Sequence, residues 1–101
     1  MADGEQAIFL VIELRVHDQA KLESYVVDVV PMMARRGGEI VGFAPAPRVV
    51  EGDWRPEMLA VHRWRSEAAF EAFYASDEYA PLKRRREEAC DARIVVVRAF
   101  R

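Results

Sequence analysis

One segment of the chain carries side chains whose types and spacing could do chemistry. Residues 7–16 alternate with period two, which places Glu13 and Arg15 on the same strand face as Phe9. Arg63 has the matching parity in a second predicted strand. If these faces coincide, an arginine can bind an anionic ligand while the desolvated Glu13 carboxylate removes a proton. We therefore predict Glu13 as a candidate catalytic base and Phe9, Arg15 and Arg63 as substrate-binding residues, with an interface ion pair as the alternative.

Trp54 is a further candidate for substrate binding. It lies between Asp53 and Arg55 in a predicted turn that follows Glu51-Gly52. A large aromatic side chain at such a turn can close over a ligand pocket or pack across a subunit interface. The sequence leaves both interpretations open.

The remaining reactive residue types do not form a recognisable site. His17 is interpreted as a turn residue at the end of the first strand, with an acid–base role as the alternative, and His62 has the parity of a core position. Two distant histidines and the single Cys90 indicate no metal site, disulfide or CxxC motif. No P-loop or GxGxxG motif is present, so we predict no cofactor.

The charge of the chain argues against nucleic-acid binding. Lys and Arg number 15 against 17 Asp and Glu, a formal net charge of −2, whereas phosphate contacts usually require a basic face. The basic run at 83–86 is followed at once by Glu87 and Glu88. This pattern is typical of a solvated helix face, and a patch for an anionic ligand or partner is the alternative.

The length of the chain, 101 residues, predicts one domain over residues 7–101 after a short tail at 1–6. The apolar run at 7–12 is too short for a signal sequence or a membrane span. With a single cysteine, these features predict a soluble cytoplasmic protein with no membrane partner.

The elements that must position these residues follow a repeated order. The first strand is followed by a helix that begins after Asp18 and ends at Gly37-Gly38, with a kink or a loosened last turn expected at Pro31. A second strand is expected at 39–44, and residues 48–50 could extend it. Pro45 and Pro47 indicate that this strand has an edge position or a bulge. We then expect a strand at 57–64, a helix capped by Ser66, a helical segment at 78–90 and a strand at 93–100.

This order, βαββαβ, predicts a ferredoxin-like α+β fold with a four-stranded antiparallel sheet and its helices on one face. Phe9 and Val11 then lie on the uncovered face with an alternate set from the later strands, namely Leu59, Val61, Val95 and Val97. A large uncovered apolar face is unusual for a monomer. We therefore predict a homodimer in which sheet packs on sheet and closes an α/β barrel.

The chain resembles the domain-of-unknown-function 1330 family over about residues 7–98. The resemblance rests on Asp18 through Tyr25, Pro31 with Gly37-Gly38, Glu51 through Pro56, and Ser66, Ala69, Phe70, Tyr74, Ser76, Glu78 and Tyr79. It implies the dimeric α/β-barrel superfamily, which includes cofactor-free monooxygenases, heme-degrading relatives and muconolactone-isomerase-like enzymes. The stretch Arg63 to Ser66 departs from the family, many members of which have an acidic residue, Phe and Pro there. The resemblance implies no particular reaction and no catalytic residue.

These observations predict a small-molecule-binding homodimer, which could be a cofactor-independent enzyme acting on a small anionic or aromatic substrate in the barrel interior. The alternative is a non-catalytic dimerisation or regulatory module whose interior is filled by side chains. The volume of the cavity separates the two, because a pocket below about 300 Å³ favours the module.

Overall fold

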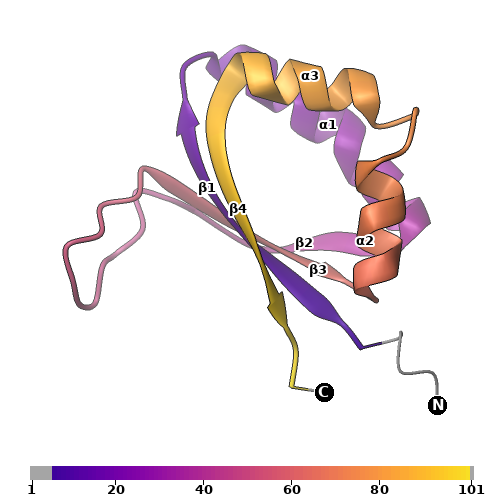
Figure 1. Cartoon of the computed structure of the whole chain (residues 1–101). Helices are drawn as coiled ribbons and strands as arrows, with labels where there is room; N and C mark the ends of the chain where they lie inside the picture. The colour runs from indigo at the N-terminus through magenta and orange to yellow at the C-terminus, as the bar shows by residue number, and fades with distance from the viewer. Residues whose placement is uncertain (1–5, 101) are drawn as a thin grey trace.

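The computed structural model describes residues 6–100 and contains a single four-stranded sheet with three helices. In chain order the elements are β1 (Ile8–Val16), α1 (Gln19–Arg36), β2 (Gly38–Pro45), β3 (Met58–Trp64), α2 (Glu67–Tyr74), α3 (Ala80–Ala89) and β4 (Cys90–Arg98). The strands are antiparallel in the order β2-β3-β1-β4, and the helices lie on one face of the sheet (Figure 1). The predicted ferredoxin-like fold is confirmed.

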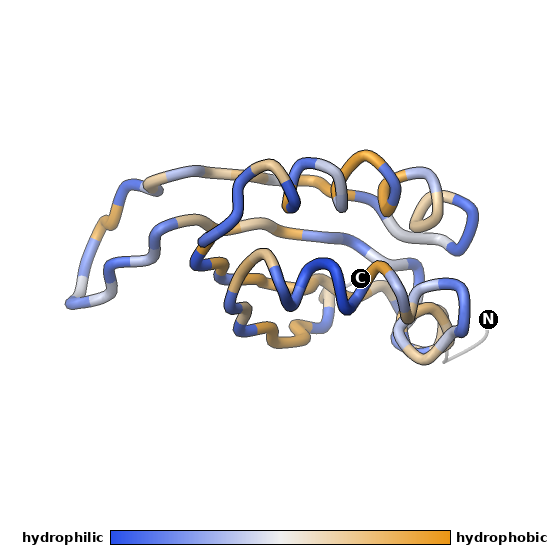
Figure 2. The backbone as a smooth tube through the Cα atoms, turned by 90° about the horizontal axis from the view of Figure 1, so that it is seen from above, coloured by the Kyte–Doolittle hydropathy of each residue, from blue (hydrophilic) through white to orange (hydrophobic). Residues whose placement is uncertain are grey.

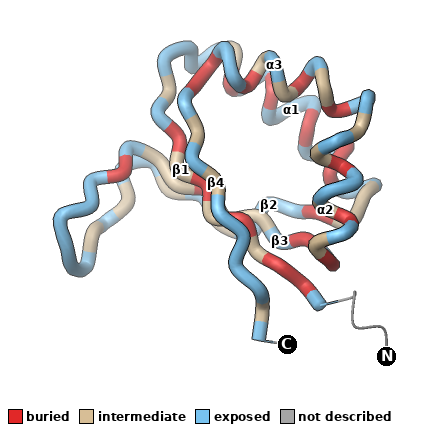
Figure 3. Tube along the Cα trace, in the orientation of Figure 1, coloured by how far each residue is buried: buried red, intermediate tan, exposed pale blue. Residues whose placement is uncertain are grey.

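The alternation of β1 explains how the sheet and helices enclose a core. Ile8, Leu10, Ile12 and Leu14 are buried, whereas the residues between them are more exposed. Buried residues gather where the strands face the helices (Figure 3). None of the helices within residues 6–100 lies over the opposite face of the sheet (Figure 1).

Capping residues set both ends of α1, as predicted. The Asp18 side chain accepts a hydrogen bond from the Lys21 backbone N–H at 3.0 Å, and Gly37 ends the helix with a left-handed φ of 96°. The helix continues past Pro31 to Arg36.

Trp64 anchors the second half of the chain to the first. Its side chain is fully buried and packs against Phe70 and Phe73 with ring-centroid distances of 5.7 and 4.8 Å. A Cβ atom on Gly38 would lie only 2.5 Å from the indole ring. The pairing of Gly38 with Trp64 across β2 and β3 therefore depends on the absence of a side chain at position 38.

Two predicted boundaries differ from the structure. β4 begins at Cys90 rather than at residue 93, because Cys90 and Asp91 pair with the end of β1. Residues 48–50 form no strand and belong to the loop between β2 and β3, which projects from one end of the molecule (Figures 1 and 2). β2 is an edge strand as expected, but its register shift lies between Ile40 and Gly42 and not at the prolines.

No helix within residues 6–100 has the length and apolar character needed to cross a membrane.

Candidate functional site

An apolar cavity of about 600 Å³ lies between the sheet and the helices. The helix-facing residues of β1 and β3 form its floor, α1 covers it, and α2, Tyr79 and Arg86 of α3 close one side. Its walls are mainly aliphatic and aromatic, and include Leu10, Ile12, Val29, Met33, Phe43, Ala60, Phe70 and Ile94. Such a cavity suits a small, mostly apolar ligand.

A row of aromatic side chains connects the two ends of this cavity. Trp64 contacts Phe73, and Phe73 packs on Tyr79 with ring centroids 4.3 Å apart. Tyr79 in turn meets the edge of Tyr25 at 6.5 Å. All four side chains line the cavity and are held by neighbours on both sides, which makes this wall rigid.

The hydroxyl groups of Tyr25 and Tyr79 give the cavity a polar end. Their oxygens lie 2.9 Å apart, in a buried hydrogen bond between residues 54 positions apart. Burial, followed by the nearby Tyr79, raises the pKa of Tyr25 above its ordinary value. The Tyr25 hydroxyl therefore stays protonated near neutral pH and can act as a hydrogen-bond donor.

Arg86 lies beside this pair and is only 7% exposed. Burial opposes its charge, but its side-chain interaction with Tyr79 and the nearby Tyr25 and Tyr74 favour it, so the pKa of Arg86 is raised. The guanidinium also lines the cavity. A positive charge therefore borders an otherwise apolar space.

His62 contributes an imidazole to the floor of the cavity. Burial lowers the pKa of His62 from its ordinary value of 6.5 to about 4, so the ring is neutral at physiological pH. Within residues 6–100 it makes no hydrogen bond or ion pair. The part-exposed His62 ring is therefore available to a ligand, whereas the Nε1 of Trp64 on the same strand has no hydrogen-bond partner but is fully buried.

The residues predicted from the sequence lie on the other face of the sheet. Glu13 accepts a hydrogen bond from Arg93 at 2.7 Å and another from the indole Nε1 of Trp54 at 3.4 Å. Arg15 lies 3.8 Å from Glu57 in an exposed ion pair. Both hydrogen bonds fall on Oε1 of Glu13, and the ion pair involves Nε of Arg15, so each side chain already has a partner within the same chain.

The structure does not bring all the predicted residues together. Arg63 pairs with Phe9 across the sheet, whereas Glu13 pairs with Leu59, four residues along β3, which is about 13 Å at the usual rise of a strand. None of Phe9, Glu13, Arg15, Trp54 or Arg63 lines the cavity. Their roles in substrate binding and catalysis stay predictions.

The sequence did contain signals for the cavity residues. Tyr25 lies on the apolar stripe of the first helix, and His62 has core parity, as predicted, but both features are equally typical of an ordinary core. Arg86 is hidden in the basic run. That run separates in the structure: Lys83 stacks over the Tyr74 ring at 4.5 Å, Arg85 bonds Asp28 of α1 at 2.7 Å, and Arg86 turns inward.

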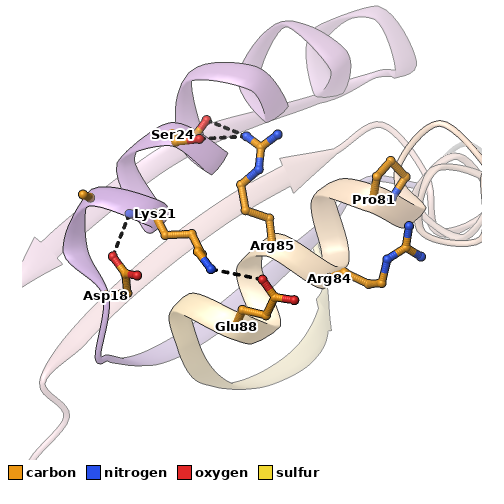
Figure 4. Close-up of a pocket in the computed structure, with 8 residues that line it drawn as sticks. Asp18, Lys21, Ser24, Pro81, Arg84, Arg85 and Glu88 are labelled. Atoms are coloured by element: carbon orange, nitrogen blue, oxygen red, sulfur yellow. Dashed lines mark hydrogen bonds and ion pairs between the residues drawn. The ribbon is translucent and has the colours of Figure 1, made fainter.

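The outer side of the basic run borders an exposed polar groove between α1 and α3 (Figure 4). Arg85 donates to the Ser24 hydroxyl at 2.9 Å, and Lys21 bonds Glu88 at 3.1 Å. These contacts join the two helices. They are the interactions of a solvated helix face, although the pairs bridge two helices instead of lying within one.

The described residues present no metal centre, since no three His, Cys, Asp or Glu side chains within 6–100 gather closely enough to hold an ion. His17 lies at the surface, 3.4 Å from Asp91. Cys90 is buried, and its thiol donates to the Arg86 backbone carbonyl at 3.4 Å.

Solved structures share this fold at low sequence identity. A protein of unknown function from Rhodopseudomonas palustris is 19% identical, with a TM-score of 0.82 over 96% of this chain and 85% of the other. SnoaB, a cofactor-independent oxygenase from Streptomyces nogalater, is 18% identical, with a TM-score of 0.70 over 95% of each chain. A proposed antibiotic biosynthesis monooxygenase from Caulobacter crescentus is 13% identical, with a TM-score of 0.70 over 97% of this chain and 93% of the other.

A search of curated proteins gave no match. A comparison with protein families matched residues 7–100 to the domain of unknown function (DUF1330), in agreement with the resemblance carried by the sequence. The matched residues include all the strands of the sheet and all the helices between residues 8 and 98. The chain therefore belongs to the DUF1330 family.

Proposed function

We propose that this protein binds a small aromatic molecule in the cavity between the sheet and the helices. The observation that carries the proposal is the volume of the cavity, about 600 Å³, which lies within the range of about 300–1,000 Å³ typical of ligand pockets. A module filled by its own side chains would leave much less space. This volume supports ligand binding between the sheet and the helices, whereas the predicted barrel interior would lie on the open face of the sheet.

The walls of the cavity favour a flat ring system. The part-exposed rings of Phe70 and Tyr74 line the cavity beside the buried row of Trp64, Phe73 and Tyr79, and aromatic ligands stack on or meet the edges of such rings. Polar atoms are few and lie at defined positions, as in binding sites where they orient a ligand.

A second candidate function, enzymatic proton transfer, is favoured by His62. A neutral imidazole without an internal partner can accept a proton from a ligand O–H or C–H, and the bonding electron pair then remains on the ligand. The fold similarity to SnoaB, itself a cofactor-independent oxygenase, supports chemistry of this kind without a bound cofactor. His62→Gln should then abolish turnover while ligand binding persists.

Binding can be tested with 2-naphthamide, a neutral ring probe, by isothermal titration calorimetry. We expect saturable binding at one site per chain. Ala60→Phe places a ring into the floor of the cavity and should abolish binding, whereas Ala68→Phe, on the exposed side of α2, should leave it unchanged. Circular dichroism of both variants checks that they fold. Absence of binding to the wild type, or full binding to Ala60→Phe, would refute the cavity as the site.

We further propose that two chains pair through the open face of the sheet. Val95 and Val97 are 59% and 46% exposed there, beside the partly buried Phe9 and Val11, and an apolar face of this kind favours association. Val11→Asp would bury an unpaired charge in the interface. Light scattering at micromolar concentration should give twice the chain mass for the wild type and a monomer for the variant; a monomeric wild type rejects the dimer.

In such a dimer, the polar residues of the open face would meet the partner subunit. The role predicted for Arg15 can be tested there, since Arg15→Gln keeps hydrogen bonding but removes the charge. If Arg15 binds an anionic substrate, the substitution should weaken binding of 2-naphthoate and preserve the dimer. Unchanged affinity would reject that role and leave the ion pair with Glu57 as its contribution.

A further inference from the structure

We propose that Arg86, together with the hydroxyl groups of Tyr25 and Tyr79, forms a subsite for a carboxylate at the polar end of the cavity. The ligand would then be an aromatic acid, with its ring on the aromatic wall and its carboxylate on the guanidinium. This inference rests on the proposed function, because it names the class of ligand for the same cavity.

The first argument is the charge of Arg86, which no acidic side chain neutralises. Only 7% of the surface of Arg86 is exposed. Nevertheless, the residue takes part in none of the ion pairs between residues 6 and 100. Buried charges in proteins are almost always paired, because desolvation of a lone ion is costly. Tyrosine hydroxyls solvate the cation but carry no opposite charge, so an anion is missing from its surroundings.

The contrast with the neighbouring cations strengthens this argument. Arg85 is paired with Asp28, Lys83 lies on the Tyr74 ring, and Arg84 is exposed to solvent. These three charges are therefore stabilised by an ion pair, by a cation–π contact and by solvent. Arg86 alone in this run turns into the protein towards the cavity.

The second argument is the arrangement of hydrogen-bond donors. A guanidinium only donates hydrogen bonds, and each tyrosine hydroxyl has one hydrogen. One of the two hydrogens is used in the bond between Tyr25 and Tyr79, which leaves the other free for a ligand. An arginine with an adjacent hydroxyl donor matches the two oxygens of a carboxylate.

The third argument is the position of the acidic side chains. Arg86 also lines a second, polar pocket of about 460 Å³, whose lining includes Glu87 and Asp91. Their negative charges disfavour an anion there and leave the inner, cavity side of the guanidinium for the ligand. Within the cavity, the carboxylate of Glu23 is exposed and accepts a hydrogen bond from Gln19 at 3.1 Å, so it does not pair with Arg86.

The test compares two probes that share one ring system, the anion 2-naphthoate and the neutral 2-naphthamide, by calorimetry at pH 7.5. The wild type should bind 2-naphthoate at least about tenfold more tightly, as expected for charge-assisted hydrogen bonds. Arg86→Met keeps the buried length of the side chain without its charge and should abolish this preference. Arg84→Met, the same change on the exposed side of α3, should retain it.

Two further variants keep the test informative if Arg86→Met fails to fold. Arg86→Lys keeps the charge and should retain part of the preference, and Tyr25→Phe removes one hydroxyl and should weaken 2-naphthoate more than 2-naphthamide. Equal affinity of the wild type for both probes, or a preference that survives Arg86→Met, would overturn the subsite but leave the proposed function in place. Failure of both probes to bind would overturn both.

Discussion

Lowering the pH from 7 to 5 should destabilise the folded protein through His62. The pKa of this histidine is lowered by burial from 6.5 to about 4, so between these values the unfolded chain binds a proton that the folded chain excludes. The free energy of unfolding therefore falls as the pH falls from 6.5 towards 4, and it keeps its full value above this window. For this shift, the loss between pH 7 and pH 5 is about 2 kcal/mol.

The assay is urea unfolding at pH 7, 6 and 5, with protein concentration held constant because a dimer unfolds in a concentration-dependent way. His62→Gln cannot take up the proton and should lose about 2 kcal/mol less than the wild type over this range. His17→Gln is the matched control, since it removes the exposed histidine and leaves His62 in place. The contribution of about 2 kcal/mol from His62 should persist in this variant.

Parallel stability curves for the wild type and His62→Gln would refute this reasoning. They would show that the imidazole gains a proton in the folded state at little cost, for example because water or a carboxylate reaches it. A direct measurement is the NMR titration of the His62 ring, which should show no protonation down to about pH 5. A midpoint near 6.5 would contradict a desolvated histidine in the cavity and remove it as a candidate base.

Two further predictions concern the packing around the cavity. Gly38→Ala should destabilise the fold by about 1–3 kcal/mol, the usual cost of overpacking, because its Cβ would lie 2.5 Å from the Trp64 ring; an unchanged urea midpoint would show that β2 shifts freely. Cys90→Ala should leave the oligomeric state and ligand binding intact, and native Cys90 should resist a thiol reagent, because burial raises the pKa of its thiol. Rapid modification of the native protein would show that this end of β4 opens.

Much of the fold followed from local features of the sequence. The period-two pattern of residues 8–16 fixes which side chains face the helices, and Asp18, Gly37 and Ser66 cap the helices where expected. These signals are local because successive side chains of a strand point to opposite faces and because a cap joins residues about three positions apart. Among the sheets that this order of elements could form, the ferredoxin-like sheet has short, regular connections, so the order predicted this fold.

The ion-pair partners could not be predicted in the same way. The period-two alternation of the strands correctly placed Glu13, Arg15 and Arg63 on one face of the sheet. It does not determine the register between neighbouring strands. That register puts Glu13 beside Arg93 of β4 and leaves Arg63 four residues away along β3. A shift of two residues would preserve every parity and change every pair.

The cavity was decided by the tertiary structure alone. Tyr25 and Tyr79 meet across 54 residues of sequence, and Arg86 differs from Arg84 and Arg85 only in the direction in which α3 turns it. Whether an apolar surface is filled by its neighbours or encloses space depends on the distance between the helices and the sheet, which is set by all the side chains packed between them. The sequence by itself determined which residues could face that space; the packing of α1, α2 and α3 decided that the space exists and that a tyrosine pair and an arginine border it.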